Sequence, residues 1–318
     1  SHMITQLIKL VLLLVIFGVT IQAPIQAQET TTCPPMPDFA RSELVMQTIE
    51  YPEMPRFYYL YIPARYDAQA PVPLVFAIHG FAQGALGLAG YSGWEAVAEE
   101  YGFILVYPQG SGVVPRWETG LFANIEGEID DVGFFSDMID TISQSLCIDS
   151  TRVYANGLSN GGGMSYRLAC ELSDKITAVG GVAGAYTEFG GCEPERPVPF
   201  MIFHGTEDTI VPYVGGDSAM FTFPSIDSFA LAWAERNGCD LTPETLPQIE
   251  DVSGIRYTNC EGNADVVFYS IAGGGHTWPG ANLTRLSDRF GGYVTQAISA
   301  SQTMWAFFSQ YTLEIDTN

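Results

Sequence analysis

A five-residue segment, Gly157-Leu158-Ser159-Asn160-Gly161, lies between a strand-like apolar run and a stretch that can form a helix. Residues 152–155 precede it, and residues 161–169 follow it. The pattern G-x-S-x-G is typical of a serine at a sharp strand-to-helix turn, where the hydroxyl projects clear of the backbone. Glycines flank such a serine because larger side chains would collide there. The segment therefore predicts an α/β fold with Ser159 as a nucleophile.

Apolar runs and helical patterns alternate along the rest of the chain. Residues 72–78 form a continuous apolar run, as expected for a strand buried on both faces. The alternation predicts a mostly parallel central sheet with helices on both faces and no large cap domain. Strands are expected at 56–62, 72–78, 103–107, 152–155, 176–182, 198–203 and 265–271, and helices at 94–101, 130–146, 225–237 and 293–310.

The first 27 residues are expected to lie outside the mature fold. The first two residues look like a tag remnant, and the rest reads as a secretory signal peptide with an apolar run at 10–19 and small residues near Ala23 and Ala27. The apolar run is short for a membrane anchor, which favours cleavage and export to the extracellular space or periplasm. Residues 28–318 are then expected to form a single α/β domain, because no linker to a further module is recognisable.

Charge and cysteine usage restrict the partners. The chain has 36 acidic and 13 basic residues, and a net charge of −23. Such a surface repels nucleic acid and anionic lipid, so we expect neither as a partner, and a neutral substrate is compatible with it. We also expect a monomer. Six cysteines without C-x-x-C spacing favour up to three disulfides over a zinc site. We predict the pair Cys239–Cys260, which flanks a polar excursion, and the other pairings stay open.

A nucleophilic serine needs a base, and the base needs an orienting carboxylate. His276 is the expected base, because it follows the apolar run 265–271 in a glycine-rich loop downstream of the serine. Asp208, after the expected strand 198–203, is the expected carboxylate, with Glu207 in the same loop as its rival. We read His204, at the end of that strand, as a packing residue under the loop.

Acyl chemistry also needs donors for a developing oxyanion. The backbone N–H of Asn160 is one expected donor, and that of Phe81, after Gly80, is the other. Trp117 and Trp278 are expected to border the substrate cleft as an aromatic wall, with an ordinary core position as the alternative. The expected acyl chemistry requires no metal or organic cofactor. Phosphate binding is not expected at the two glycine-rich runs, because neither is followed by the Lys-Ser/Thr of a phosphate-binding loop.

Several segments between residues 70 and 285 resemble one family of secreted esterases. This family groups polyhydroxybutyrate depolymerases with feruloyl and acetylxylan esterases, and is similar to carbohydrate esterase family 1 and the LpqC-type proteins. The resemblance implies an α/β-hydrolase fold with Ser159, Asp208 and His276 as a catalytic triad. The segments are Ile78-His79-Gly80, Tyr107-Pro108-Gln109-Gly110, Asp130-Asp131-Val132-Gly133-Phe134, Gly157-Leu158-Ser159-Asn160-Gly161-Gly162, His204-Gly205-Thr206-Glu207-Asp208, Val211-Pro212-Tyr213 and Gly274-Gly275-His276-Thr277-Trp278-Pro279.

The resemblance implies a secreted serine carboxylesterase acting on feruloyl or acetyl esters of plant polysaccharides. The alternative is an extracellular depolymerase of polyhydroxybutyrate or a similar short-chain polyester. A non-catalytic binding protein on the same scaffold is a third reading, and the complete set of three catalytic residue types argues against it. Asn282-Leu283-Thr284 is a glycosylation sequon, and its use depends on the host.

Overall fold

The computed structural model describes residues 33–35, 38–121, 129–218, 221–282 and 291–314. Internal contacts divide the chain into two units, Ser1–Thr32 and Cys33–Asn318. The described helices and strands belong to the second unit. The expected tag remnant and signal peptide lie outside the described residues. Among the residues that are described, no helix has the length and apolar character needed to cross a membrane.

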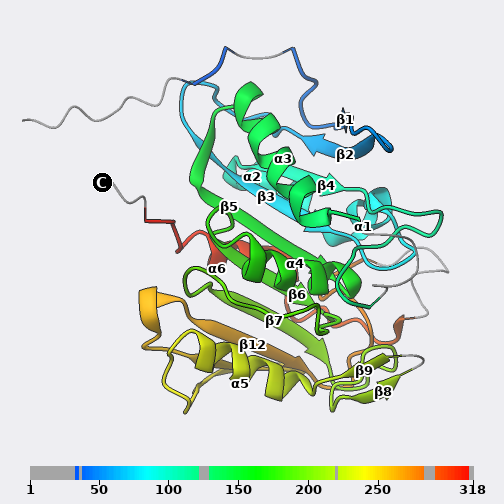
Figure 1. The fold of residues 1–318 in the computed structure, drawn as a ribbon. Helices are drawn as coiled ribbons and strands as arrows, with labels where there is room; N and C mark the ends of the chain where they lie inside the picture. Colours follow the sequence, from blue (N-terminus) through cyan, green and yellow to red (C-terminus); the bar gives the residue numbers. More distant parts are fainter. Residues whose placement is uncertain (1–32, 36–37, 122–128, 219–220, 283–290, 315–318) are drawn as a thin grey trace, which may run out of the picture. The chain divides into compact units, whose positions relative to one another are not determined.

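A ten-stranded sheet forms the centre of the second unit, in the order β1-β2-β4-β3-β5-β6-β7-β12-β11-β10 (Figure 1). Neighbours from β4 through to β12 run parallel, and the strands on either side pair antiparallel. The mostly parallel sheet expected from the sequence is confirmed. The strands are β1 (Leu44–Ile49), β2 (Arg56–Tyr61), β3 (Val72–Ile78), β4 (Ile104–Pro108), β5 (Ile148–Leu158), β6 (Ala178–Val182), β7 (Phe200–Gly205), β10 (Glu244–Ile249), β11 (Val252–Tyr257) and β12 (Val266–Ile271), with a separate hairpin of β8 (Gly216–Ser218) and β9 (Phe221–Phe223).

Helices cover the sheet on both faces (Figure 1). Along β3, Leu74, Phe76 and Ile78 pack into the core beneath α3, α4 and α5, whereas Val75 and Ala77 pack into the core with α1, α2 and α6. This alternation is the period-two geometry of a strand buried on both sides. The helices are α1 (Ala85–Ser92), α2 (Trp94–Tyr101), α3 (Asp131–Ser145), α4 (Asn160–Glu171), α5 (Ile226–Arg236) and α6 (Ala300–Phe308), with a short 3₁₀ turn, η1 (Glu261–Asn263).

Side-chain caps explain where two of the predicted helices begin. The Asp130 carboxylate accepts a hydrogen bond from the Gly133 N–H at the start of α3, at 2.7 Å. Ser225 caps α5 in the same way by accepting from the Ser228 N–H, at 3.2 Å. Each cap satisfies an N–H that has no partner within the helix, which is worth about 1 kcal/mol. The observed bounds of both helices lie within one residue of the expected ones.

The prediction of a helix at 293–310 is wrong for residues 293–299, because α6 begins only at Ala300. The carbonyl oxygens of Tyr293 and Thr295 accept hydrogen bonds from Gly275 and Gly280 instead of from later residues of their own helix. The Ser299 side chain then caps α6. Residues 293–299 therefore support the neighbouring loop 272–281, which a pattern of helical periodicity does not reveal.

The polar excursion between Cys239 and Cys260 forms the hairpin β10–β11, which the sequence reading did not identify as strands. Pro247 and Gly254 are residue types that are depleted in strands, so the sequence did not indicate strands here. Proline is tolerated here because β10 lies at the edge of the sheet, where one row of backbone groups has no strand partner.

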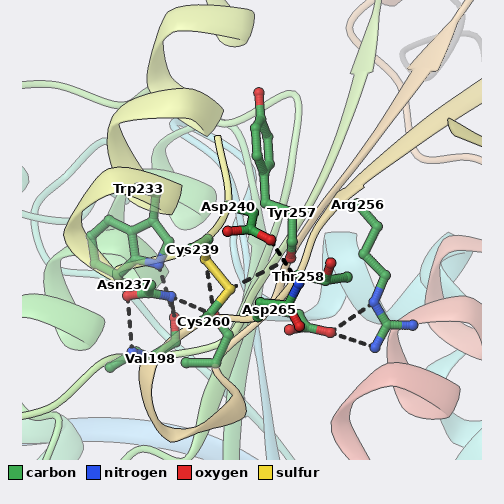
Figure 2. Close-up of a disulfide and its surroundings, with 12 residues drawn as sticks. Val198, Trp233, Asn237, Cys239, Asp240, Arg256, Tyr257, Thr258, Cys260 and Asp265 are labelled. Atoms are coloured by element: carbon green, nitrogen blue, oxygen red, sulfur yellow. Dashed lines mark hydrogen bonds and ion pairs between the residues drawn. A yellow bond between two sulfur atoms is a disulfide. The ribbon is translucent and has the colours of Figure 1, made fainter. Parts of the chain in front are cut away.

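The predicted disulfide Cys239–Cys260 is confirmed, and Cys33–Cys147 and Cys170–Cys192 are also formed. Figure 2 shows the first of these beside Asn237, whose amide donates to the carbonyl oxygens of Val198 and Ala264, both at 2.8 Å. The disulfide joins the segment after α5 to the segment after β11, and the hydrogen bond from Asn237 to Val198 ties the end of α5 to the start of β7. The loops that follow β7 and β12 lie at the opposite edge of the sheet.

Replacing Cys239 and Cys260 together by serine is expected to lower the free energy of unfolding by about 3 kcal/mol, because the unfolded chain loses the closure of a loop of about 22 residues. Urea unfolding of the oxidised proteins measures the difference. Ser253→Ala, an exposed substitution on β11, is the control and should stay within about 0.5 kcal/mol of the parent. A double serine variant as stable as this control would contradict the prediction.

Candidate active site

Ser159 lies in a strained turn between β5 and α4. Its backbone has φ 56° and ψ −119°, a conformation that side-chain-bearing residues rarely adopt. Hydrogen bonds hold the turn, since the Ser159 N–H donates to the Val182 carbonyl and the Ala185 N–H donates to the Ser159 carbonyl, both at 2.9 Å. Such strain persists where surrounding structure imposes it, often at functional sites. The strand-to-helix context expected for Ser159 is therefore present, and the residue is partly exposed.

Two glycines allow the backbone to pack closely around this turn. A Cβ at Gly161 would overlap the Ile78 carbonyl oxygen, so α4 can start against β3 only with glycine there. A Cβ at Gly80 would lie 3.3 Å from the Ser159 Cβ. The loop after β3 therefore passes directly beside the serine.

Asp208 and His276 meet across the ends of two paired strands. β7 and β12 run parallel with Gly205 opposite Ile271, so the loops that follow them leave the sheet at one level. The His276 Nδ1 lies 2.8 Å from the Asp208 Oδ2. The rival carboxylate, Glu207, is exposed, and its backbone N–H donates to the Gly274 carbonyl. Asp208 is thus the residue of this loop that faces the imidazole.

Three hydrogen bonds fix the loop that carries His276. The Gly273 N–H donates to the Thr206 hydroxyl at 2.8 Å, and the Glu207 N–H donates to the Gly274 carbonyl at 2.9 Å. On the other side, the Gly275 N–H donates to the Tyr293 carbonyl at 3.1 Å. The loop that carries the imidazole is therefore held by neighbouring segments on both sides.

The Asp208 carboxylate is buried and fully hydrogen-bonded. Oδ1 accepts from the N–H groups of Ile210 and Val211, both at 2.9 Å. Burial alone would raise the pKa of Asp208, but hydrogen bonds from His204 and His276 outweigh it and hold the pKa well below its usual range. The carboxylate is therefore ionised at neutral pH. It accepts the Nδ1 proton of His276, which leaves Nε2 of that ring as a proton acceptor.

Asn160 and Trp117 connect the two expected oxyanion donors. Asn160 is the first residue of α4, so its N–H has no partner within the helix and lies at the positive end of the helix dipole. Its side-chain oxygen accepts from the Trp117 N–H at 2.7 Å. The Trp117 indole in turn donates to the His79 carbonyl at 2.9 Å, next to the loop that carries Phe81. The sequence reading missed this bridge, although His79 and Asn160 lie inside the motifs that it used.

The expected aromatic wall is not formed by Trp117 or Trp278. The two residues are 0% and 1% exposed, because both rings pack inside the core and use their indole N–H groups within it. Neither ring presents a face to a substrate. Phe81 is 48% exposed on the loop after β3, and Ile210, two residues after Asp208, is 49% exposed.

The buried side chain of His79 supports the loop after β3, and its contacts fit one protonation state of the ring. Its Nδ1 lies 2.7 Å from the Gly80 carbonyl and its Nε2 accepts from the Gly110 N–H at 2.9 Å, so the neutral Nδ1–H tautomer satisfies both contacts. Burial lowers the pKa of His79 to about 4, against the smaller raising effect of the Gly80 hydrogen bond. The loop beside Ser159 is therefore supported by a neutral imidazole at physiological pH.

Taken together, these residues provide the parts needed for acyl transfer. A serine hydroxyl, an imidazole paired with a carboxylate and a helix N-terminus all lie at the carboxyl edge of the parallel strands.

Comparison with known proteins places this chain among esterases. Residues 56–193 match the family model described as esterase PHB depolymerase. A probable feruloyl esterase C from Aspergillus oryzae is 32% identical over 224 residues, which cover 70% of this chain and 76% of that protein. Feruloyl esterase B from Piromyces equi is 37% identical over 158 residues, which cover 47% of this chain and 29% of that protein. This chain therefore spans less than a third of the length of the Piromyces protein.

A solved structure supports the fold. The acetyl xylan esterase from Aspergillus awamori superposes with a TM-score of 0.54 at 19% identity, covering 73% of this chain and 94% of that one. At this identity the likeness concerns the fold alone, which is an α/β-hydrolase fold.

Protonation of His79 is expected to destabilise the protein in mild acid. The folded-state pKa lies below the ordinary value of 6.5, so the unfolded chain binds more protons between about pH 6.5 and 4. The neutral ring therefore makes its full contribution to the free energy of unfolding above about pH 6.5. This contribution falls as the pH drops, by about 3 kcal/mol in total.

Urea unfolding at about pH 7 and about pH 4 tests this expectation in the parent protein and in His79→Asn. The variant lacks the titrating ring, so it should lose about 3 kcal/mol less than the parent across this range. Equal losses in the two proteins would contradict the assignment.

Proposed function

Because this chain belongs to the family of PHB depolymerase-type and feruloyl esterases, we propose that it is a secreted serine carboxylesterase that hydrolyses feruloyl or acetyl esters of plant polysaccharides. The observation that carries the proposal is the 2.8 Å contact between Asp208 and His276, at the sheet edge where the turn presents Ser159. A buried carboxylate that orients an imidazole, together with a serine at a strained strand-to-helix turn, has its established use in acyl transfer.

In the proposed mechanism, hydrolysis proceeds in two steps. His276 Nε2 takes the hydroxyl proton of Ser159 as the oxygen attacks the ester carbonyl, and Asp208 stabilises the imidazolium that forms. The N–H groups of Phe81 and Asn160 hold the oxyanion. The imidazolium then gives its proton to the departing alcohol, which leaves an acyl group on the serine. Water attacks this acyl-enzyme with His276 again as the base, and the acid is released.

The surroundings of this site support a neutral ester with an apolar acyl group. The side chains of Phe81 and Ile210 are about half exposed on the loops that carry the oxyanion position and Asp208. A planar aromatic acyl group such as ferulate can bury its ring against such side chains. The net charge of −23 disfavours an anionic substrate.

A short-chain polyester is the second candidate substrate. It is favoured by the match of residues 56–193 to the family model that bears the name of the polyhydroxybutyrate depolymerases. The same two-step chemistry cleaves both kinds of ester, so the choice depends on the acyl and alcohol groups that the site accepts.

Secretion as a monomer is part of the proposal. Three disulfides support an oxidising compartment, because such bonds persist mainly outside the cytosol. The signal-peptide pattern in the first 27 residues supports the same destination.

Ser159→Ala is expected to lower the rate of ester hydrolysis by at least about 10⁴-fold, because the nucleophile is lost while the fold is kept. Chromatography of the acid released from methyl ferulate, together with release of p-nitrophenol from p-nitrophenyl acetate, measures the rate. Ser165→Ala, a buried serine of α4 whose hydroxyl bonds the Gly161 carbonyl, is the matched control and should keep activity within a few-fold.

The substrate pattern then separates the candidates. Ferulate release that depends on Ser159 supports the feruloyl esterase. Cleavage of p-nitrophenyl acetate and of 3-hydroxybutyrate oligomers, without ferulate release, supports the polyester reading. Activity that survives Ser159→Ala would contradict the proposed mechanism for every substrate.

A further inference from the structure

A second histidine contacts the carboxylate of the proposed triad. His204 is the penultimate residue of β7, opposite Ser270 of β12, and its side chain is 0% exposed. Its Nε2 lies 3.3 Å from the Asp208 Oδ2, the same oxygen that contacts His276. The sequence reading assigned His204 only a packing role. Because the His204 ring contacts the Asp208 carboxylate, a role beyond packing can be tested.

The contacts of the His204 ring select one tautomer. Nε2 also lies 2.9 Å from the Val211 carbonyl oxygen, which can only accept a hydrogen bond. Nδ1 is buried and has no hydrogen-bond partner. A proton on Nδ1 would therefore be buried without an acceptor, whereas a proton on Nε2 is shared between Val211 and Asp208. The contacts thus favour the Nε2–H tautomer, in which Nε2 is the donor.

We propose that His204 is a positioning residue for the hydrolysis, which holds the Asp208 carboxylate in the orientation that His276 requires. The inference rests on the function proposed above and adds a residue to it. Backbone N–H groups anchor Oδ1 of the carboxylate, whereas His204 contacts Oδ2, the oxygen that also contacts His276. His204 thus gives Oδ2 a contact besides the imidazole that it is meant to orient.

The other groups around His204 support this reading. The Tyr213 ring lies edge-on to His204 with 6.1 Å between the ring centres, and the Tyr213 hydroxyl contacts Asp227 at 3.4 Å. Asp208 is the carboxylate in contact with the ring, and His276 lies beyond it. The hydrogen bonds that keep Asp208 ionised therefore come from two histidines with different tasks. One is the proposed base, and the other positions the carboxylate.

Two amide substitutions test the proposal because their side chains differ in length, and only the longer one can donate to Asp208. The side-chain nitrogen of His204→Gln can occupy the place of Nε2 and donate to Asp208, whereas the amide of His204→Asn ends near the place of Nδ1 and falls short. We expect His204→Asn to lower kcat for p-nitrophenyl acetate about tenfold with little change in KM, in keeping with the loss of a hydrogen bond to a charged group. His204→Gln should recover at least a third of the parental kcat.

A spectroscopic readout separates positioning from general packing. The His276 Nδ1 proton, held between nitrogen and carboxylate, should give a far-downfield proton NMR resonance in the parent protein. This resonance should persist in His204→Gln and shift or broaden in His204→Asn. Tyr213→Phe, which keeps the ring against His204 but does not touch Asp208, is the control and should leave both kcat and the resonance unchanged.

Two results would overturn the proposal. The first is a His204→Asn variant with parental kcat and an unchanged resonance. The second is an equal loss of kcat in the Asn and Gln variants with the resonance unchanged, which indicates packing alone. If neither variant folds, nitrogen-15 NMR of the parent protein decides, since a His204 ring protonated at Nδ1 contradicts the proposal. Failure of the esterase proposal is seen separately, as parental activity that survives Ser159→Ala.

Discussion

The parallel pairing of β7 with β12 is the constraint on which the site depends. It places Gly205 opposite Ile271, so that the two loops leaving these strands are joined by hydrogen bonds between Thr206, Glu207 and the glycines that precede His276. Only this register brings the buried Asp208 carboxylate to 2.8 Å from the imidazole. A single-residue slip in a strand would turn the side chains to the other face of the sheet and separate the pair.

A second set of contacts positions Ser159 and the loop that passes beside it. Close backbone packing at Gly80 and Gly161 lets the loop after β3 pass beside Ser159. Trp117 then ties that loop to Asn160 through one indole and one backbone hydrogen bond. Buried aromatic and histidine side chains thus act here as supports for backbone N–H groups.

Elements that depend on local sequence pattern could be predicted from the sequence, whereas elements that depend on contacts with distant parts of the chain could not. The continuous apolar run at 72–78 and the capped helix near 130–146 correspond closely to β3 and α3, because burial and capping act within a few residues. Residues 293–299 and the edge hairpin β10–β11 were missed, since their conformations depend on hydrogen bonds to loop 272–281 and to β12. The burial of Trp117 and Trp278 depends in the same way on partners far along the chain.

Labelling with a p-nitrophenyl phosphonate ester, followed by mass spectrometry of the digested protein, tests the central claim most directly. Such a reagent forms a stable adduct with a serine that a neighbouring imidazole activates. The proposed site predicts one adduct on the peptide that contains Ser159, formed much more slowly in Asp208→Asn because the imidazole is then no longer held by a carboxylate. An adduct on another residue, or none on a folded protein, would contradict the assignment of this edge of the sheet as the active site.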